Sequence, residues 1–272
     1  MKFEELQIDP DILKVLHELK FEEPTEIQEK TIPLMKQGLD VIGESATGSG
    51  KTLAFAVRII EKTIKGEGIQ ALILVPTREL CEQVSKEMRK FSKYKHLSVT
   101  AVYGGVSYGQ QIENLENTEI VVGTPGRILD HLKRKTFALK KVKILVIDET
   151  DRMFDMGFIY DVTDIINHTP NERQTMLFSA TINSDIEHIG RKYMKNPKMV
   201  SAVDHVDPSL LKQYYYEVPQ NAKFSLLVHL LKEERSGLVM VFCNTRQNVN
   251  TLAKNLKRIG IEDYPTHGGL TQ

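Results

Sequence analysis

Short apolar runs alternate with longer amphipathic stretches along most of the chain. The runs are too short for helices and most contain β-branched residues, so they predict buried strands. The expected strands are Ala71–Val75, Val99–Tyr103, Ile120–Val122, Lys143–Ile147 and Thr175–Phe178. The helices expected between them are Thr52–Lys65, Glu79–Phe91, Gly126–Arg134, Ile159–Asn167 and Ser184–Met194. This alternation predicts βαβ units and therefore an α/β fold, with a mostly parallel sheet that helices cover on both faces.

Helix signals also precede the first of these strands. Asp9 is placed to cap a helix whose first turn contains Pro10, since a short polar side chain can accept from the free N–H groups at a helix start. A second helix is expected to begin near Thr25. Pro33 inside its pattern predicts a kink or a break, because proline has no N–H group to donate.

The strand–helix pattern restarts after residue 208. The segment 196–208 carries turn residues and ends with a proline, so we interpret it as the exit from a first domain, residues 1–208. The elements expected beyond it are strands at Gln213–Val218 and Leu238–Phe242 and helices at Phe224–Lys232 and Val249–Ile259. Two strands are too few for a parallel sheet buried on both faces. Residues 209–272 are therefore expected to form an incomplete second domain, either because the chain is a fragment or because something else completes it.

Composition narrows the choice of partners and compartment. Lys and Arg number 36, as do Asp and Glu, so the formal net charge of the 272-residue chain is zero. This balance excludes binding through bulk positive charge and leaves room for a local phosphate-binding face. The acidic N-terminus is unlike a secretory signal, and no apolar run is long enough to span a membrane. The two cysteines, Cys81 and Cys243, match no zinc spacing, which favours a reduced, cytoplasmic location.

A glycine-rich segment joins the apolar stretch Asp40–Gly43 to the helix expected from Thr52. Such a segment between a strand and a helix, ending in Gly-Lys-Thr, is the pattern of a phosphate-binding loop. Glycine lets backbone N–H groups approach phosphates, the lysine reaches the β- and γ-phosphates, and the threonine hydroxyl can bind Mg²⁺. The residues of this candidate site are Ser45, Ala46, Thr47, Gly48, Ser49, Gly50, Lys51 and Thr52.

Two carboxylates, Asp148 and Glu149, directly follow one of the apolar strands. In open α/β sheets, ligands bind at the carboxyl ends of the strands. Asp148 is expected to hold Mg²⁺ through its water shell, together with Thr52. Glu149 is expected to act as the general base for attack of water on the γ-phosphate. With Lys51, these two carboxylates predict a catalytic site that hydrolyses a nucleoside triphosphate.

With these motifs, the chain resembles the DEAD-box RNA helicases of helicase superfamily two over nearly its whole length. Phe21–Gln28 resembles the adenine-recognition motif of that family. The resemblance implies that Gln28 reads the adenine edge and Phe21 stacks on the ring, with ATP and Mg²⁺ as cofactors. A side-chain amide can donate and accept, as adenine N6 and N7 require. Residues 241–246 and 267–272 resemble later motifs, which implies a RecA-like P-loop domain followed by the beginning of a second RecA-like domain.

Other strand-end segments resemble the motifs through which the family contacts RNA and couples its domains. The RNA-contacting residues implied are Pro76, Thr77, Arg78, Gly104, Gly105, Thr124, Pro125, Gly126 and Arg127. Contacts to phosphate and sugar make binding independent of base sequence, and contacts to the 2′-OH favour RNA over DNA. Ser179 and Thr181 resemble motif III. Their hydroxyls are expected to hydrogen-bond Asp151 and to link the nucleotide state to domain closure.

The sequence departs from the family pattern at two positions and stops before the family's last motifs. Lys20 stands where the family usually has Gly, and Thr150 stands where motif II has Ala. The arginine fingers of the family would lie beyond Gln272, so this chain alone is expected to be weakly active. The expected function is an ATP-dependent RNA helicase that couples hydrolysis to local unwinding or remodelling of RNA–protein complexes. The alternatives are an ATP-gated RNA clamp without unwinding activity, or another P-loop ATPase such as a DNA helicase.

Overall fold

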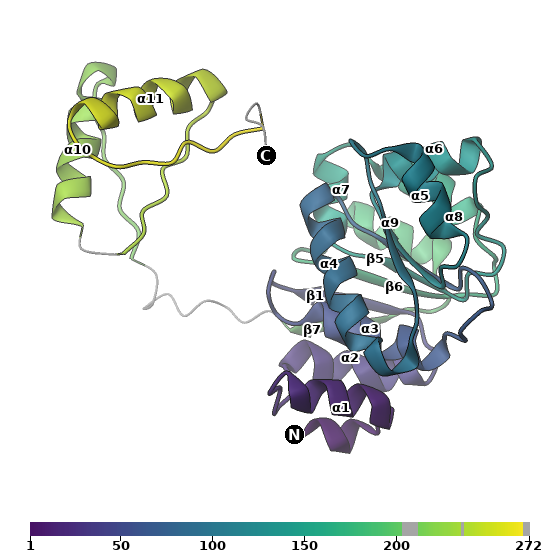
Figure 1. Cartoon of the computed structure of the whole chain (residues 1–272). Helices are drawn as coiled ribbons and strands as arrows, with labels where there is room; N and C mark the ends of the chain where they lie inside the picture. Colours follow the sequence, from purple (N-terminus) through teal and green to yellow (C-terminus); the bar gives the residue numbers. More distant parts are fainter. Residues whose placement is uncertain (203–211, 235–236, 269–272) are drawn as a thin grey trace. The chain divides into compact units, whose positions relative to one another are not determined.

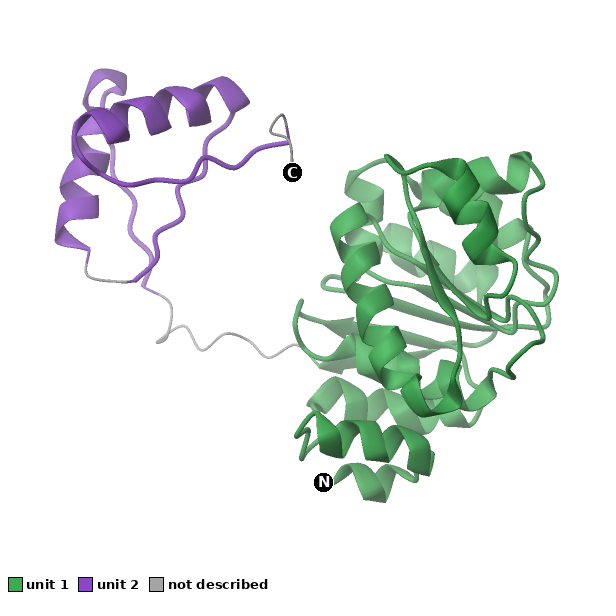
Figure 2. Cartoon of the chain, viewed as in Figure 1, with its two compact units in different colours: residues 1–205 green, residues 206–272 purple. Residues whose placement is uncertain are grey.

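The computed structural model describes residues 1–202, 212–234 and 237–268 (Figure 1). The chain divides into two compact units, Met1–His205 and Val206–Gln272 (Figure 2). The start of the last expected motif, His267 and Gly268, lies within the described residues, and the rest of that motif lies outside them.

The first unit is built on a seven-stranded sheet with the strand order β3-β4-β2-β5-β6-β1-β7. All neighbouring strands run parallel, so the α/β fold expected from the sequence is confirmed. The strands expected from the apolar runs are present, with small differences at their ends. The strands are β1 (Val41–Ser45), β2 (Ala71–Leu74), β3 (Val99–Val102), β4 (Ile120–Gly123), β5 (Ile144–Ile147), β6 (Gln174–Ser179) and β7 (Lys198–Ala202).

Helices cover both faces of this sheet. Alternate strand residues point to opposite faces, so Ala71 and Ile73 of β2 join one core cluster while Leu72 and Leu74 join the other. The first cluster contains the buried faces of α1 to α4, and the second those of α6 to α8, with α9 packed on Ile42 and Leu177. The helices are α1 (Pro10–Glu18), α2 (Glu26–Lys36), α3 (Lys51–Lys62), α4 (Arg78–Phe91), α5 (Tyr108–Leu115), α6 (Pro125–Lys133), α7 (Thr150–Asp155), α8 (Ile159–Asn167) and α9 (Ser184–Tyr193).

The first two helices begin as their capping residues predict. The Asp9 side chain accepts from the Asp11 N–H at the start of α1, and Pro10 occupies the first turn. Thr25 and Gln28 form a capping box at the start of α2. The break considered at Pro33 does not occur, because α2 continues through Pro33 to Lys36 and the Gln37 N–H donates to the Pro33 carbonyl.

The first unit ends at His205, within the segment 196–208 that we interpret as the exit from the first domain. The sequence did not indicate that this segment also contains a strand, β7, which pairs with β1. This strand lies at the edge of the sheet, and its residues Lys198, Met199 and Ser201 are exposed. The apolar pattern that marks the central strands is therefore missing from β7.

The regular elements that the structure describes in the second unit are helices. They are α10 (Lys223–Glu233) and α11 (Arg246–Arg258), close to the expected bounds, and a short 3-10 helix, Gln220–Ala222. Within residues 212–234 and 237–268, the strands expected at 213–218 and 238–242 do not form. Both segments are mainly exposed, with Tyr215 at 86% and Phe242 at 89%. A parallel strand needs neighbouring strands to form hydrogen bonds with its backbone N–H and C=O groups. An apolar run alone therefore does not produce a strand.

Candidate functional site

The loop from β1 to α3 has the backbone expected of a phosphate-binding loop. Gly48 and Gly50 adopt positive φ angles of 84° and 92°, which L-residues rarely tolerate. The Lys51 ammonium is buried and donates to the Ser45 carbonyl at 3.0 Å. The Ser49 hydroxyl donates to the Ser45 hydroxyl at 2.9 Å. Ser45 is itself fully buried, so it supports the loop from the end of β1.

Two residues at the start of α2 hold this loop from the side. Gln28 Nε2 donates to the Gly50 carbonyl at 2.9 Å, and the Thr25 hydroxyl donates to the Ser49 carbonyl at 2.7 Å. A Cβ atom on Gly50 would lie 2.3 Å from Gln28 Nε2, so this contact requires glycine. The sequence placed the start of a helix near Thr25 but did not indicate its hydrogen bond to the loop.

A cavity of about 580 Å³ joins these segments at the carboxyl edge of the sheet. Most of the predicted nucleotide residues line it, whereas Ser45, Ala46 and Ser49 do not. The predicted residues in the lining are Phe21, Gln28, Thr47, Gly48, Gly50, Lys51, Thr52, Asp148 and Glu149. The lining also includes Thr77 from the candidate RNA loops and residues of α4 that the sequence did not suggest, among them Leu80, Gln83 and Phe91. The cavity thus combines four segments that are far apart in the chain.

The two carboxylates at the end of β5 lie in different environments. Asp148 is buried, and this burial raises the pKa of its carboxyl to about 6, against the attraction of Lys51 and the hydrogen bond from the Glu149 N–H. Glu149 has a positive φ of 51°, which is uncommon for a side chain of this size. Its carboxylate pairs with Arg152 at 3.0 Å, a contact that sequence reasoning missed although Arg152 follows at helical spacing.

The next residues connect β5 to β6. The Thr150 hydroxyl lies 3.2 Å from the Ile147 carbonyl and 3.1 Å from the Phe178 carbonyl, so it can donate at the ends of both strands. The Asp151 N–H donates to the Ser179 hydroxyl at 3.2 Å. The Asp151 carboxylate accepts from the Thr181 N–H at 3.1 Å and from its hydroxyl at 3.2 Å. The structure therefore brings Asp151, Ser179 and Thr181 into direct contact.

The donor set around Asp148 fits a small divalent cation. The Thr52 hydroxyl and the Asp148 carboxylate line the same cavity, and oxygen is the ligand that Mg²⁺ prefers. In the described residues, the hydrogen bond that Asp148 accepts through its side chain uses Oδ1, which leaves Oδ2 for a metal-bound water. The described residues contain no cluster of three or more His, Cys, Asp or Glu able to hold a metal. Mg²⁺ bound with phosphates usually takes only one or two protein carboxylates, which Asp148 can supply.

The candidate RNA loops lie at the carboxyl ends of β2, β3 and β4, along the same edge. Arg78 begins α4, pairs with Glu82 at 3.6 Å and lies over the Tyr103 ring at 5.0 Å. Arg127 donates to the Val106 carbonyl at 3.2 Å and lies over the Tyr108 ring at 4.1 Å. Pro76 and Pro125 are buried and anchor their loops, whereas Gly104, Gly105 and Gly126 are exposed.

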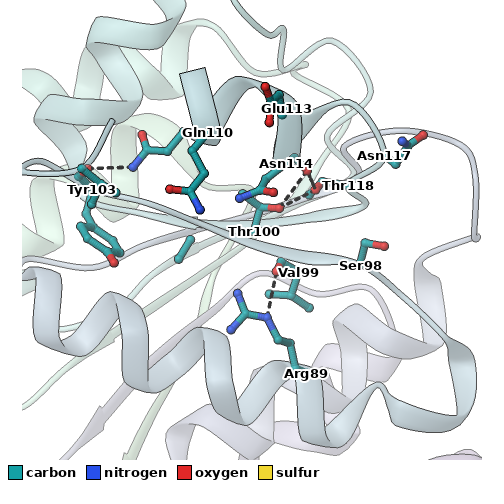
Figure 3. Close-up of a pocket in the computed structure, with 13 residues that line it drawn as sticks. Arg89, Ser98, Val99, Thr100, Tyr103, Gln110, Glu113, Asn114, Asn117 and Thr118 are labelled. Carbon is teal, nitrogen blue, oxygen red and sulfur yellow. Dashed lines mark hydrogen bonds between the residues drawn. The ribbon is translucent and has the colours of Figure 1, made fainter. Parts of the chain in front are cut away.

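A second cavity of about 550 Å³ lies at the β3 edge of the sheet (Figure 3). Its walls come from α4 and α5, and most of its side chains are polar, including Arg89, Gln110 and Asn114. Arg89 Nε donates to the Val99 carbonyl at 3.1 Å, and Gln111 Nε2 donates to the Tyr103 carbonyl at 2.9 Å. These side chains satisfy backbone groups on the open side of the edge strand.

Among the described residues, no helix is long and apolar enough to cross a membrane.

The fold and the strand-end loops define an α/β domain of the RecA-like P-loop class. The DEAD/DEAH box helicase family model matches residues 25–189. The chain is 45% identical over 274 residues to an ATP-dependent RNA helicase CshA of Listeria monocytogenes, covering 100% of this chain and 53% of that protein. It is 42% identical to a probable ATP-dependent RNA helicase of Methanocaldococcus jannaschii, covering 100% of this chain and 73% of that protein. The chain therefore belongs to the DEAD/DEAH box helicase family.

Solved structures agree with this assignment. A DEAD box protein from the hyperthermophile Methanococcus jannaschii superposes with a TM-score of 0.73 at 40% identity, covering 100% of this chain and 74% of that one. A hypothetical ATP-dependent RNA helicase from Sulfolobus tokodaii gives a TM-score of 0.69 at 37% identity, covering 91% of this chain and 72% of that one. The chain spans about half the length of several curated bacterial relatives, at 53%, 58% and 55%.

Proposed function

We propose that this chain is the nucleotide-binding part of an ATP-dependent RNA helicase. The observation that carries the proposal is the shared cavity, which combines the adenine-recognition segment, the phosphate-binding loop, one side of α4 and the two carboxylates after β5. The family relation supports the same assignment. The whole protein is proposed to use ATP hydrolysis to unwind short duplexes or to remodel RNA–protein complexes.

Gln28 is proposed to recognise adenine without releasing the phosphate-binding loop. Its Oε1 accepts from the Thr25 N–H at 3.0 Å and its Nε2 donates to the Gly50 carbonyl at 2.9 Å. A side-chain amide has two N–H groups and two acceptor lone pairs, so one of each remains for a base. Phe21 is 44% exposed and lines the same cavity, which leaves its ring accessible for stacking.

Lys51, Asp148 and Glu149 are proposed as the catalytic residues. Lys51 would exchange its contact with the Ser45 carbonyl for phosphate oxygens, because an anionic oxygen is the stronger acceptor. Thr52 and Asp148 would hold Mg²⁺, which neutralises phosphate charge during transfer. Glu149 would take a proton from the attacking water after its carboxylate leaves Arg152. Asp151, Ser179 and Thr181 would couple this site to domain closure.

The strand-end loops at residues 76–78, 104–105 and 124–127 are proposed to bind the RNA backbone. Exposed glycines and the N-termini of α4 and α6 offer N–H groups to phosphates, and Arg78 and Arg127 add positive charge. Such contacts predict little dependence on base sequence.

Equilibrium binding by this chain tests the proposal. A fluorescent ADP analogue should bind in the presence of Mg²⁺, and ATP should displace it at much lower concentrations than GTP. ATP hydrolysis by the whole protein should rise on addition of single-stranded RNA and not of DNA with the same base sequence, whereas this chain alone should hydrolyse ATP slowly. Stimulation by DNA alone would favour a DNA helicase, and failure to bind any adenine nucleotide would refute the proposal.

A further inference from the structure

Gln111 of α5 lies between two of the candidate RNA loops. Its Nε2 donates to the carbonyl of Tyr103, the residue before the Gly104–Gly105 pair, at 2.9 Å. Its Oε1 accepts from Arg127 Nη1 at 3.4 Å and lies 2.9 Å from His131 Nε2. Gln111 is only 3% exposed, so it is part of the protein interior and is not free to contact RNA itself.

The surroundings fix the orientation of this amide. A carbonyl can only accept and a guanidinium can only donate, so Tyr103 and Arg127 require Nε2 and Oε1 where they are. His131 Nε2 must therefore carry a proton and donate to Gln111. Burial and the nearby Arg127 charge lower the pKa of His131, which keeps the ring neutral near pH 7. Its other nitrogen, Nδ1, lies 2.7 Å from the Thr136 hydroxyl, which also lies 3.1 Å from the His131 carbonyl.

The imidazole is held by packing as well as by hydrogen bonds. His131 is fully buried on α6, with the Tyr108 ring centroid 4.9 Å and the Phe137 ring centroid 5.8 Å from its own. It therefore gives Gln111 a fixed donor, whereas a solvent-exposed donor would let the amide rotate. The neighbouring Gln110, also an amide on α5, is exposed and lines the β3-edge cavity (Figure 3).

We infer that Gln111, oriented by His131, is a positioning residue that holds the Gly104–Gly105 loop and Arg127 in the arrangement that binds RNA. The inference rests on the proposed RNA-binding function of these loops and adds residues that touch no RNA. It explains why a buried amide and a buried imidazole occupy a place between α5 and α6 that apolar side chains could fill. Buried polar groups of this kind are retained where they fix one arrangement.

The test compares Gln111→Met with Gln110→Met in this chain. Methionine keeps the length of glutamine and removes its hydrogen bonds. The Kd for a fluorescein-labelled 12-nucleotide oligouridylate should rise about tenfold in Gln111→Met, because RNA binding must then order the Gly104–Gly105 loop and Arg127, at a cost of about one lost hydrogen bond. Affinity for a fluorescent ADP analogue should not change. Gln110→Met should match the parent in both measurements. The slope of log Kd against log salt should also fall by about 0.7 in Gln111→Met, since a displaced Arg127 loses one phosphate contact.

Two further measurements separate positioning from general destabilisation. Hydrogen exchange should become faster in Gln111→Met at residues 103–106 and 127, and remain unchanged in the central strands. His131→Phe should also raise the Kd for RNA. Adding Gln111→Met to His131→Phe should raise the Kd by a smaller factor than Gln111→Met does in the parent chain.

Unchanged RNA affinity in Gln111→Met, or a loss of protection spread over the whole sheet, would overturn the inference. If the parent chain bound no RNA, the proposed RNA-binding function would fail. In that case the exchange measurement, which needs no RNA, would still decide whether Gln111 orders the loop.

Discussion

Asp148→Asn should stabilise the chain in the absence of nucleotide and Mg²⁺, at the expense of its proposed function. Asp148 is 3% exposed, and burial raises its pKa from 3.8 to about 6. Above that pH the folded protein must keep a buried charge that the unfolded chain exposes to water. Asparagine has nearly the same shape and can still accept from the Glu149 N–H through its Oδ1.

The size of the effect follows from the pKa difference. The interval between 3.8 and about 6 corresponds to about 3 kcal/mol of unfolding free energy above pH 6. The attraction between Asp148 and the buried Lys51 is already contained in that pKa. The loss of this attraction in Asp148→Asn is therefore already counted in that figure.

Urea unfolding in EDTA, without nucleotide, measures the effect. The raised pKa means that the folded state binds the proton more tightly than the unfolded state does. The Asp148 charge therefore lowers the unfolding free energy above pH 6, and this effect disappears as the pH falls towards 4. Asp148→Asn should therefore be more stable than the parent at pH 7.5, and this advantage should shrink at pH 5. Asp155→Asn, an exposed carboxylate on α7, serves as the matched control and should show no such advantage.

Binding of Mg²⁺ and nucleotide should favour the parent over Asp148→Asn in unfolding free energy. Mg²⁺ and ADP should raise the unfolding free energy of the parent more than that of Asp148→Asn, because the variant lacks a proposed metal-binding carboxylate. Equal stability of the two proteins at pH 7.5, or an advantage that does not change between pH 7.5 and 5, would contradict the assignment of a buried charge to Asp148.

Three other substitutions test separate parts of the site. Gln28→Met should reduce the preference for ATP over GTP about tenfold in nucleotide titrations, and an unchanged preference would remove Gln28 from adenine recognition. Glu149→Gln should leave nucleotide affinity nearly unchanged but lower single-turnover hydrolysis at least a hundredfold, on the order expected for general-base catalysis, and hydrolysis at the parent rate would exclude that role. Thr150→Ala should lower the unfolding free energy by about 1 kcal/mol without changing nucleotide affinity, since the partners of its hydroxyl in the described part of the chain are the Ile147 and Phe178 carbonyls. A change in affinity instead would place Thr150 in the binding site.

The central strands and the phosphate-binding loop could be predicted because their signals are local. β5 is buried throughout, so it appears as a continuous apolar run, and the carboxylates that follow it stand out against that run. The two left-handed glycines, Gly48 and Gly50, are recognisable for a similar reason, since each is required by the backbone at its own position. Such features need no knowledge of distant residues.

Features that depend on exposure or on distant partners could not be predicted in this way. β7 pairs with β1 across a long separation in sequence, and its exposed side chains give no apolar pattern. The helices α5 and α7 were also missed, because both are short and neither carries enough apolar positions to establish a helical period. The hydrogen bond from Gln28 to Gly50 joins residues 22 positions apart, and nothing local to either residue indicates it.

Thr150 shows how a departure from a family pattern can be explained only by the fold. Its hydroxyl can donate at the ends of β5 and β6, while Asp148 on one side faces the cavity and Asp151 on the other accepts from Thr181. These residues belong to one tight turn, which contains the positive φ of Glu149 and the first turn of α7. Asp148 at the cavity and Asp151 at its contact with Thr181 are therefore separated by only two residues, Glu149 and Thr150. The chemistry proposed at β5 and the coupling proposed at β6 thus depend on the same short segment, and Thr150 ties that segment to both strands.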